Sequence, residues 1–238
     1  MASISKKIDE NITQIETMFG NWSDIVERRF DLDRCAWGDD PAIYVVYIDG
    51  LCDHELIENT LIKPITWEWR NKDTADLWEH IISCEGQTAD YTQESDMDNV
   101  VRAVLRGAIF VSGSDQAIVV SSKHFPVRGI EESSTEGGMR GPRDSFNENF
   151  RTSTALIRRR IKDVHLKLEQ GTMGVRSRTE YGIFYMEDIA EPELVQQIRD
   201  TIDKYEIDAV FDSGMAEHLM EKKWQEIFPI YQATTRPD

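Results

Sequence analysis

The chain has 238 residues, of which 40% are hydrophobic and 30% are charged, and its formal net charge is −17. That composition is typical of a folded globular protein, and the strong negative charge excludes nucleic acid as a partner, because phosphate binding needs a basic surface. The longest uninterrupted apolar run, residues 42–48, is far shorter than the ~20 residues of a membrane helix, and the chain opens with no secretory signal. Its three cysteines form no CxxC pair and indicate a reducing compartment.

Hydrophobic periodicity predicts six elements in the first half of the chain. Apolar residues three and four positions apart indicate helices, and alternation of apolar and polar residues indicates half-buried strands. The continuous apolar run at residues 42–48 indicates a strand that is buried on both faces. In chain order these elements are a helix, two strands, two helices and a β-hairpin, over residues 4–19, 24–32, 42–48, 53–62, 100–105 and 108–120.

The order helix, strand, strand, helix occurs again in the second half. These four elements are predicted over residues 144–162, 164–169, 181–186 and 192–202. Residues 47–57 align without a gap with residues 185–195, and residues 91–98 align with residues 231–238, where both segments begin with Tyr and end with Asp. Two matches at nearly the same offset indicate an internal repeat.

The repeat predicts an α/β protein with two similar lobes, each a small mixed β-sheet with packed helices. We expect the lobes to comprise residues 1–124 and residues 140–238, joined by a flexible Gly-, Ser- and Glu-rich linker over residues 125–139, with a cleft between the lobes. After residue 98 the first copy continues with a helix and a hairpin, whereas the second copy reaches residue 238. We therefore expect a second lobe that is truncated at its C-terminus and lacks these elements.

The most distinctive segment is residues 140–162, RGPRDSFNENFRTSTALIRRRIK. It closely resembles the signature GPR-x-x-F-x-E-N-x-R-T-x-T-x-L-I-R-R-R-I of the A subunits of bacterial spore germinant receptors, the GerA family. The resemblance extends to residues 47–51, 211–214 and 235–238, and so covers nearly the whole chain. One departure is Ser153, which stands where family members often carry Asn.

The resemblance implies a location, partners and a role. Family members begin with a hydrophilic cytoplasmic domain like this chain and continue into helices of the spore inner membrane. They act with B and C subunits, and a homo-oligomer within the full receptor is a further expectation. The receptors detect small nutrient germinants such as amino acids, sugars or nucleosides and commit the spore to germinate.

Basic residues are concentrated between residues 139 and 178, where the net charge is +6 against −23 for the remainder of the chain. Asp144 and Ser145 are expected to cap the helix that follows, and the basic residues near its end favour the helix dipole. Two interpretations remain open: the basic side chains pair with acids of the same protein or with solvent, or they contact anionic lipid or a partner subunit. The candidates for such contacts are Arg158, Arg159, Arg160 and Lys162.

Candidate ligand-binding residues lie at two helix starts. Free N–H groups at such a start can hold a carboxylate or phosphate, so Arg140 and Arg143 in the preceding loop are candidates. Asp212 and Ser213 either cap a helix or offer a carboxylate to an amino group. For each residue the alternative is a purely structural role in a turn, a cap or a polar helix face. The other candidates are polar residues of the predicted 144–162 helix: Asn147, Asn149, Arg151 and Thr154.

No motif for catalysis, metal or cofactor stands out. The five histidines show no HxH or HExxH spacing, and no Ser/His/Asp or Cys/His set is evident. We therefore expect a non-enzymatic receptor module without a cofactor, which senses a germinant in the cleft between the lobes or relays the signal to the membrane part. The alternative hypothesis is an assembly scaffold that binds no ligand and contacts the other subunits or the membrane surface through the basic helix.

Overall fold

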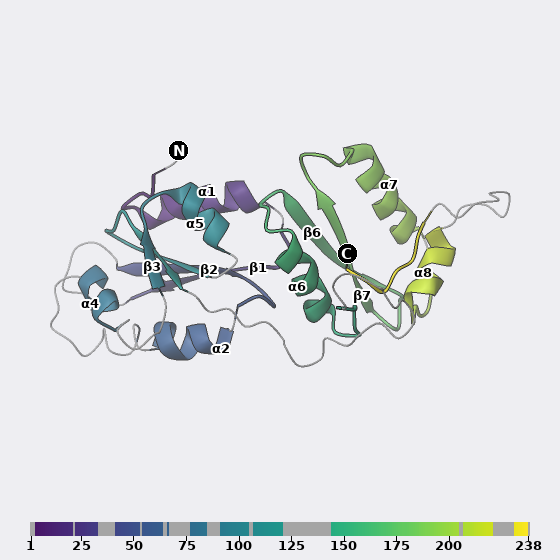
Figure 1. Cartoon of the computed structure of the whole chain (residues 1–238), viewed down its shortest axis with the longest axis horizontal. Coiled ribbons are helices and arrows are strands. Elements are labelled where there is room, and N and C mark those ends of the chain that lie inside the picture. The colour runs from purple at the N-terminus through teal and green to yellow at the C-terminus, as the bar shows by residue number, and fades with distance from the viewer. Residues whose placement is uncertain are drawn as a thin grey trace. The chain divides into compact units, whose positions relative to one another are not determined.

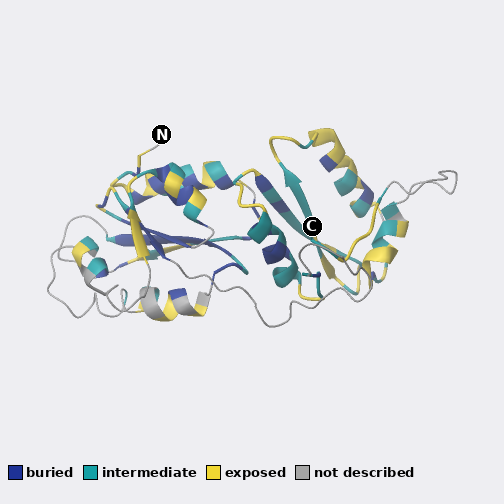
Figure 2. Cartoon of the chain, in the orientation of Figure 1, coloured by how far each residue is buried: buried dark blue, intermediate teal, exposed yellow. Residues whose placement is uncertain are grey.

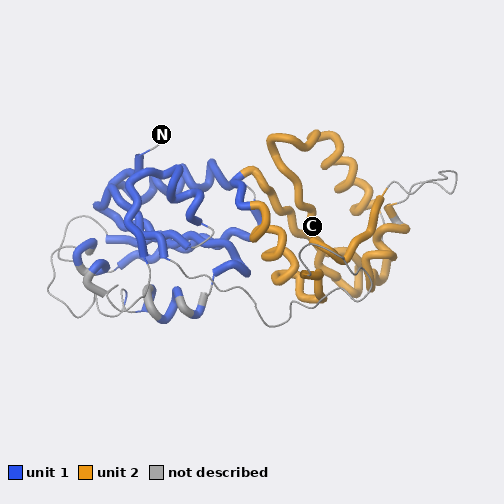
Figure 3. The backbone as a smooth tube through the Cα atoms, viewed as in Figure 1, with its two compact units in different colours: residues 1–126, 162–164 blue, residues 127–161, 165–238 orange. Residues whose placement is uncertain are grey.

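The computed structural model describes residues 3–20, 22–32, 41–52, 54–63, 66, 77–84, 91–104, 107–120, 144–204, 207–220 and 231–237. The chain divides into two compact units, residues 1–126 with 162–164 and residues 127–161 with 165–238 (Figure 3). Each unit contains its own β-sheet. The predicted linker at residues 125–139 lies outside the described residues.

The first unit is built on a five-stranded antiparallel sheet in the order β1-β2-β4-β5-β3 (Figure 1). Every residue of β2, β4 and β5 is buried, as expected for apolar strands inside a sheet, whereas the edge strands β1 and β3 are partly exposed. The strands are β1 (Ile25–Asp31), β2 (Ala42–Ile48), β3 (Tyr91–Glu94), β4 (Ala108–Val111) and β5 (Ala117–Val120).

Helices accompany this sheet, and the apolar periodicity predicts all of them except the helix over residues 77–84. In α1 the buried residues are Ile8, Asn11, Ile15 and Phe19, which follow three- and four-residue steps. The N-cap of α5 is Asp96, whose side chain accepts a hydrogen bond from the Asp98 N–H at 3.0 Å. The helices are α1 (Ile8–Phe19), α2 (His54–Ile57), the π-helical η1 (Glu58–Ile62), α4 (Leu77–Cys84) and α5 (Met97–Ala103). The predicted cap Asp53 lies outside the described residues.

The core of the first unit gathers on β2 (Figure 2). One cluster contains Ile43 and Val45 together with Ile57 of α2 and Ile81 of α4. Ile43, Val45, Ile57 and Ile81 are each no more than 2% exposed. Burial of each such side chain contributes about 1.5–3 kcal/mol, so this cluster provides much of the stability of the unit.

Among its described residues, the second unit has a two-stranded antiparallel sheet of β6 and β7 with three helices. Gly171 lies opposite Tyr181 across the hairpin, and a side chain at Gly171 would collide with the Tyr181 ring. Apolar residues of β7 are only half-buried, in contrast to those of β2. The elements are α6 (Phe150–Arg160), β6 (Leu166–Met173), β7 (Thr179–Met186), α7 (Pro192–Asp203) and α8 (Ser213–Met220).

Equivalent backbone hydrogen bonds occur in the first hairpin of each unit, as the predicted repeat would require. The Asp49 N–H donates to the Asp24 carbonyl at 2.8 Å in the first unit. The Glu187 N–H donates to the His165 carbonyl at 2.8 Å in the second. Asp49 and Glu187 are matched in the ungapped sequence alignment, so each second strand pairs with its neighbour in the same register.

The start of the first helix in each unit shows the same correspondence. Asn11 lies three residues after the start of α1, and its Nδ2 donates to the Ser5 carbonyl at 2.7 Å. Ser153 lies three residues after the start of α6, and its Oγ donates to the Asn147 carbonyl at 3.1 Å. Both side chains therefore fasten the chain that enters the helix.

The expectation of mixed sheets is wrong for the described strands, which all pair antiparallel. In the first unit, β3 and β4 run in the same direction and are joined through α5. They are not neighbours, because β5 lies between them and pairs antiparallel with both. A helical crossover is thus present without a parallel pair of strands.

Candidate ligand-binding site

The helix predicted from residue 144 begins at Phe150. Its N-cap is Asn149, whose Oδ1 accepts a hydrogen bond from the Thr152 N–H at 2.9 Å. The Oδ1 atom of Asn147 accepts a hydrogen bond from the Asn149 N–H at 3.1 Å and shapes the turn before the cap. Both asparagines proposed as ligand contacts therefore make hydrogen bonds that begin α6.

Asp144 does not cap the helix, which corrects the expectation from the sequence. Its carboxylate pairs with Arg159 at 2.5 Å and with Arg160 at 3.2 Å, near the other end of α6. Ser145 does not cap the helix either, because its hydroxyl donates to the Thr235 carbonyl at 3.1 Å. The acidic and basic ends of this segment thus bind each other.

Arg158 is 1% exposed, so its candidate role as a partner or membrane contact conflicts with its position. Its guanidinium donates a hydrogen bond to the main-chain carbonyl of Leu166 and lies 5.6 Å from the ring centroid of Phe184. Lys162, in contrast, is exposed. Contacts of Arg159, Arg160 and Lys162 with another molecule stay predictions.

Two further candidates lie in the first turns of α6. The Thr154 hydroxyl donates to the Arg151 carbonyl at 3.0 Å and is 3% exposed. The guanidinium of Arg151 lies 5.7 Å from the centroid of the Phe150 ring. Arg140 and Arg143 lie outside the described residues, so their contact with a ligand stays a prediction.

Asp212 caps α8. Its Oδ1 accepts a hydrogen bond from the Met215 N–H at 2.7 Å, and its carbonyl accepts one from the Ala216 N–H at 3.3 Å. Ser213 is the exposed first residue of the helix. The observed hydrogen bonds match the structural alternative, in which the carboxylate satisfies free N–H groups of its own helix.

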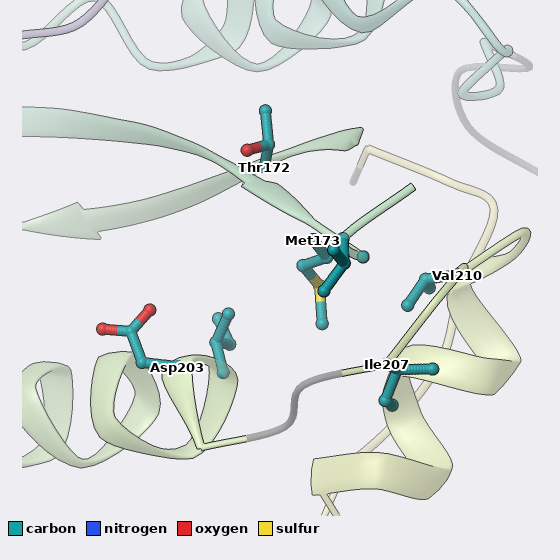
Figure 4. A pocket seen from close by; sticks show the side chains of 8 residues that line it. Thr172, Met173, Asp203, Ile207 and Val210 are labelled. Atoms are coloured by element: carbon teal, nitrogen blue, oxygen red, sulfur yellow. The ribbon is translucent and has the colours of Figure 1, made fainter. Parts of the chain in front are cut away.

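A pocket of about 240 Å³ lies in the second unit, where the end of β6 meets the end of α7 and the segment that leads to α8 (Figure 4). The side chains of Met173, Ile207 and Val210 line a common space, while the carboxylate of Asp203 is directed away from Ile207 and Val210. The pocket thus combines apolar side chains with a nearly equal share of polar surface. The lining residues are Thr172, Met173, Gly174, Val175, Ile202, Asp203, Ile207 and Val210.

Backbone contacts join two of the segments that line the pocket. Gly174 has φ +83°, and a Cβ there would lie 2.3 Å from the Ser177 Oγ. The Val175 N–H donates to the Ile207 carbonyl at 2.8 Å, which fixes the turn after β6 against the segment after α7. The sequence interpretation missed this pocket. The sequence feature that could have indicated the pocket is Gly174, which lies between the apolar residues Met173 and Val175 soon after a predicted strand.

A charged cluster attaches α7 to the hairpin beside this pocket. The Nε of Arg199 donates to Glu169 Oε2 at 2.7 Å, and the Tyr185 hydroxyl donates to Glu169 Oε1 at 2.5 Å. The hydrogen bond from Arg199 lowers the pKa of Glu169 below its ordinary value. Burial, followed by the Glu169 hydrogen bond, raises the pKa of Tyr185 to about 12. This arrangement stabilises one ionised, partly exposed carboxylate of the second unit.

Two features are absent from the residues that the structure describes. No three His, Cys, Asp or Glu side chains gather there closely enough to hold a metal ion. Within those same ranges, no helix is long and apolar enough to cross a bilayer.

Comparison with known proteins defines the class. A family model for the Bacillus/Clostridium GerA spore germination protein matches residues 13–238, so the chain belongs to this family. The uncharacterized membrane protein YfkQ of Bacillus subtilis is 30% identical over 99% of this chain and 45% of its own length. Spore germination protein KA of the same organism is 28% identical over 99% of this chain and 43% of its own length. The chain thus spans about half the length of these curated relatives.

A solved structure shows the same fold. The crystal structure of the N-terminal domain of the A subunit of the Bacillus megaterium spore germinant receptor GerK3 matches with a TM-score of 0.72 at 26% identity. The match covers 99% of this chain and 86% of that one. The resemblance inferred from residues 140–162 is therefore confirmed, and so is an α/β fold.

Proposed function

We propose that this chain is the N-terminal part of a spore germinant receptor A subunit and takes part in nutrient-triggered germination. The observation that carries the proposal is the match to the GerK3 A-subunit domain over 99% of the chain, together with the family match over residues 13–238. In the full protein this part would lie on the cytoplasmic side of the spore inner membrane and act with B and C subunits.

Within this role the chain senses a small nutrient or relays a change of shape to the rest of the receptor. The pocket in the second unit supports sensing, because its volume of about 240 Å³ suits a small molecule. Its lining offers both apolar side chains and polar groups, which suits a nutrient that carries both, such as an amino acid. The ligand cleft between the two lobes that the sequence suggested stays a prediction.

The scaffold alternative has less support from the positions of the arginines. Arg158 is buried, and Arg159 and Arg160 pair with Asp144 of their own unit. A scaffold that used this helix would have to break those ion pairs or rely on Lys162. Sensing or relay is accordingly the function we propose.

Two measurements test the proposal together. Spores that lack the full protein should lose the response to at least one nutrient class while sporulation and heat resistance remain normal. Purified chain should show amide shifts at the pocket on titration with L-alanine, D-glucose or inosine if it senses. Lost germination without binding supports relay. Germination that is unchanged with all three nutrient classes contradicts both.

A further inference from the structure

Apolar side chains stand exposed at one end of the second unit. Phe211 is 81% exposed, Val175 is 64% exposed and Met215 is 38% exposed. Val175 and Phe211 each follow one member of a close contact, because a Cβ at Gly174 would lie 3.3 Å from the Val210 N atom. Single exposed apolar residues are normal on a soluble protein, whereas a contiguous group marks an interaction site. We call Val175, Phe211 and Met215 the apolar tip.

Hydrogen bonds fix the apolar tip on the second unit. The Arg176 and Ser177 N–H groups both donate to the Asp208 carbonyl, at 2.9 Å and 3.2 Å. The Thr179 hydroxyl donates to the Val210 carbonyl at 2.5 Å. These bonds tie the turn between β6 and β7 to the segment that leads to α8. The apolar side chains are therefore presented by a backbone with fixed partners.

A local packing role does not account for Phe211. An apolar residue just before an N-cap often packs on the fourth residue of its helix and fixes the entry of the chain. Asp212 is the N-cap of α8, so Phe211 holds this position and Ala216 is the fourth residue. A single methyl group covers little of an aromatic ring, which agrees with the exposure of Phe211. The ring is thus available for contact with another molecule.

Charged groups beside the apolar tip leave one arginine available. Arg176 and Asp208 form an exposed ion pair at 3.6 Å. The carboxylate of Asp212 accepts the Met215 N–H and lies at the positive end of the α8 dipole. Arg178 is exposed and forms no ion pair among the residues that the structure describes. The tip therefore offers apolar side chains next to an available guanidinium.

Four exposed acids gather at the opposite end of the hairpin. Glu187 and Asp188 follow β7, and Glu191 and Glu193 lie at the start of α7. The eight residues of β7 extend over roughly 26 Å. Charges that far apart are screened, because the Debye length is about 8 Å at physiological ionic strength. These acids therefore do not repel an anionic surface from the apolar tip, although the formal net charge of the chain is −17.

Exposed apolar side chains with a guanidinium beside them match the layers of a phospholipid surface, in which acyl chains lie below phosphate groups. We propose that the apolar tip docks the second unit on a phospholipid bilayer. Phe211 and Val175 enter the boundary between headgroups and acyl chains, and Arg178 binds a lipid phosphate. The inference rests on the proposed function, which places this part of the receptor beside the spore inner membrane. Val210 lines the pocket and directly precedes Phe211, so docking holds one wall of the pocket at the membrane.

Co-sedimentation with vesicles of phosphatidylcholine and about one third phosphatidylglycerol tests the docking, and circular dichroism checks that each variant is folded. Residues 1–238 should bind at millimolar lipid. Phe211→Ser combined with Val175→Ser should lower the partition coefficient at least about tenfold, because the buried apolar area is lost. Arg178→Gln should lower it about fivefold. Ile189→Ser removes another exposed apolar side chain of the second unit and is the matched control, which should bind like the unmodified chain. Absence of binding at millimolar lipid, or equal binding of the double variant and the control, would overturn the proposal.

A spin-labelled lipid in the same vesicles locates the contact. It should broaden the amide signals of residues 174–179 and 210–215 more than those of residues 187–194. Strongest broadening at residues 158–162 would overturn the proposal in favour of the basic helix, and uniform broadening would overturn it as well. Broadening at the apolar tip that increases with protein concentration in the absence of lipid would replace the bilayer by a second copy. Neither measurement involves a nutrient or spores, so docking can fail while the proposed function holds, and the reverse.

Discussion

Arg158 donates a hydrogen bond from its guanidinium to the main-chain carbonyl of Leu166, and both residues are buried in the second unit. Leu166 lies opposite Met186 in a position whose backbone groups point away from β7. The arginine therefore supplies the hydrogen-bond donor that a further strand would supply. Through this bond the last turn of α6 is tied to the first residue of β6.

Replacement of Arg158 should weaken the second unit strongly. Arg158→Ala leaves a cavity and removes the donor to a buried carbonyl, so we expect the free energy of unfolding to fall by about 2–4 kcal/mol. Arg159→Ala, at a partly exposed ion pair, should cost no more than about 1 kcal/mol. Urea unfolding of residues 1–238 measures both. Similar losses of unfolding free energy in the two variants would mean that the buried hydrogen bond of Arg158 contributes little to stability.

The three consecutive arginines show what the sequence could and could not predict. Their charge and helical setting were evident, but successive residues on a helix point in directions about 100° apart, so 158–160 cannot share one face. Arg158 is directed inward and its neighbours reach Asp144. The partner acid lies fifteen residues earlier than Arg159, and periodicity carries no information about such a contact.

Elements were predicted better than their contacts. Most strands and helices of the first unit follow from apolar runs and steps, but α4 and β3 were not predicted. The repeat was inferred from matched residues. The start of α6 was misplaced, because Asp144 and Asn149 are both good N-cap residues and only tertiary pairing of Asp144 with Arg159 decides between them. The pocket was missed because it forms where the separate segments at Met173 and Ile207 meet.

Ser153 occupies the position that Asn11 holds in the first unit. Asn11 is fully buried, donates to the Ser5 carbonyl and accepts from the Ser5 N–H at 2.8 Å. Ser153→Asn should allow the same pair of bonds with Asn147 and raise the free energy of unfolding by about 0.5–1 kcal/mol. Asn11→Ser should lower it by about 1–2 kcal/mol, because a buried polar group loses a partner. Opposite signs in thermal or urea unfolding are the expected result; a destabilised Ser153→Asn protein would argue against the equivalence.

Asn149 caps α6, because its Oδ1 accepts a hydrogen bond from the Thr152 N–H. Asn149→Ala should lower the free energy of unfolding by about 1 kcal/mol. Asn149→Asp keeps the acceptor, so its free energy of unfolding should lie within a few tenths of a kcal/mol of that of the unmodified chain. The two variants separate the cap from a ligand contact. If both unfold like the unmodified protein but abolish a ligand-induced amide shift, the ligand-contact interpretation is the better one.

Stability should depend on pH through Glu169. Its pKa is lowered in the folded chain by the hydrogen bond from Arg199. The stability that ionised Glu169 contributes is therefore fully present above the ordinary Glu pKa of 4.5, and it disappears as the pH falls through the lowered pKa. Glu169→Gln should therefore cost about 1 kcal/mol at pH 7 and nearly nothing at the lowest pH where the chain still folds. Urea unfolding of both proteins across this range measures the difference, and a pH-independent difference would exclude the ion pair as its source.

The proposed role in germination is tested most directly by filling the pocket in the intact receptor. Ile207→Trp places a large side chain in the space between Met173 and Val210, whereas Ile189→Trp changes a residue that is 75% exposed and lines no part of the pocket. Circular dichroism of residues 1–238 first establishes that both variants fold. We predict that spores with Ile207→Trp lose at least tenfold in their germination rate with the nutrient that they detect, and that spores with Ile189→Trp respond normally. Equal, normal germination of the two strains would contradict a sensing role for this part of the receptor.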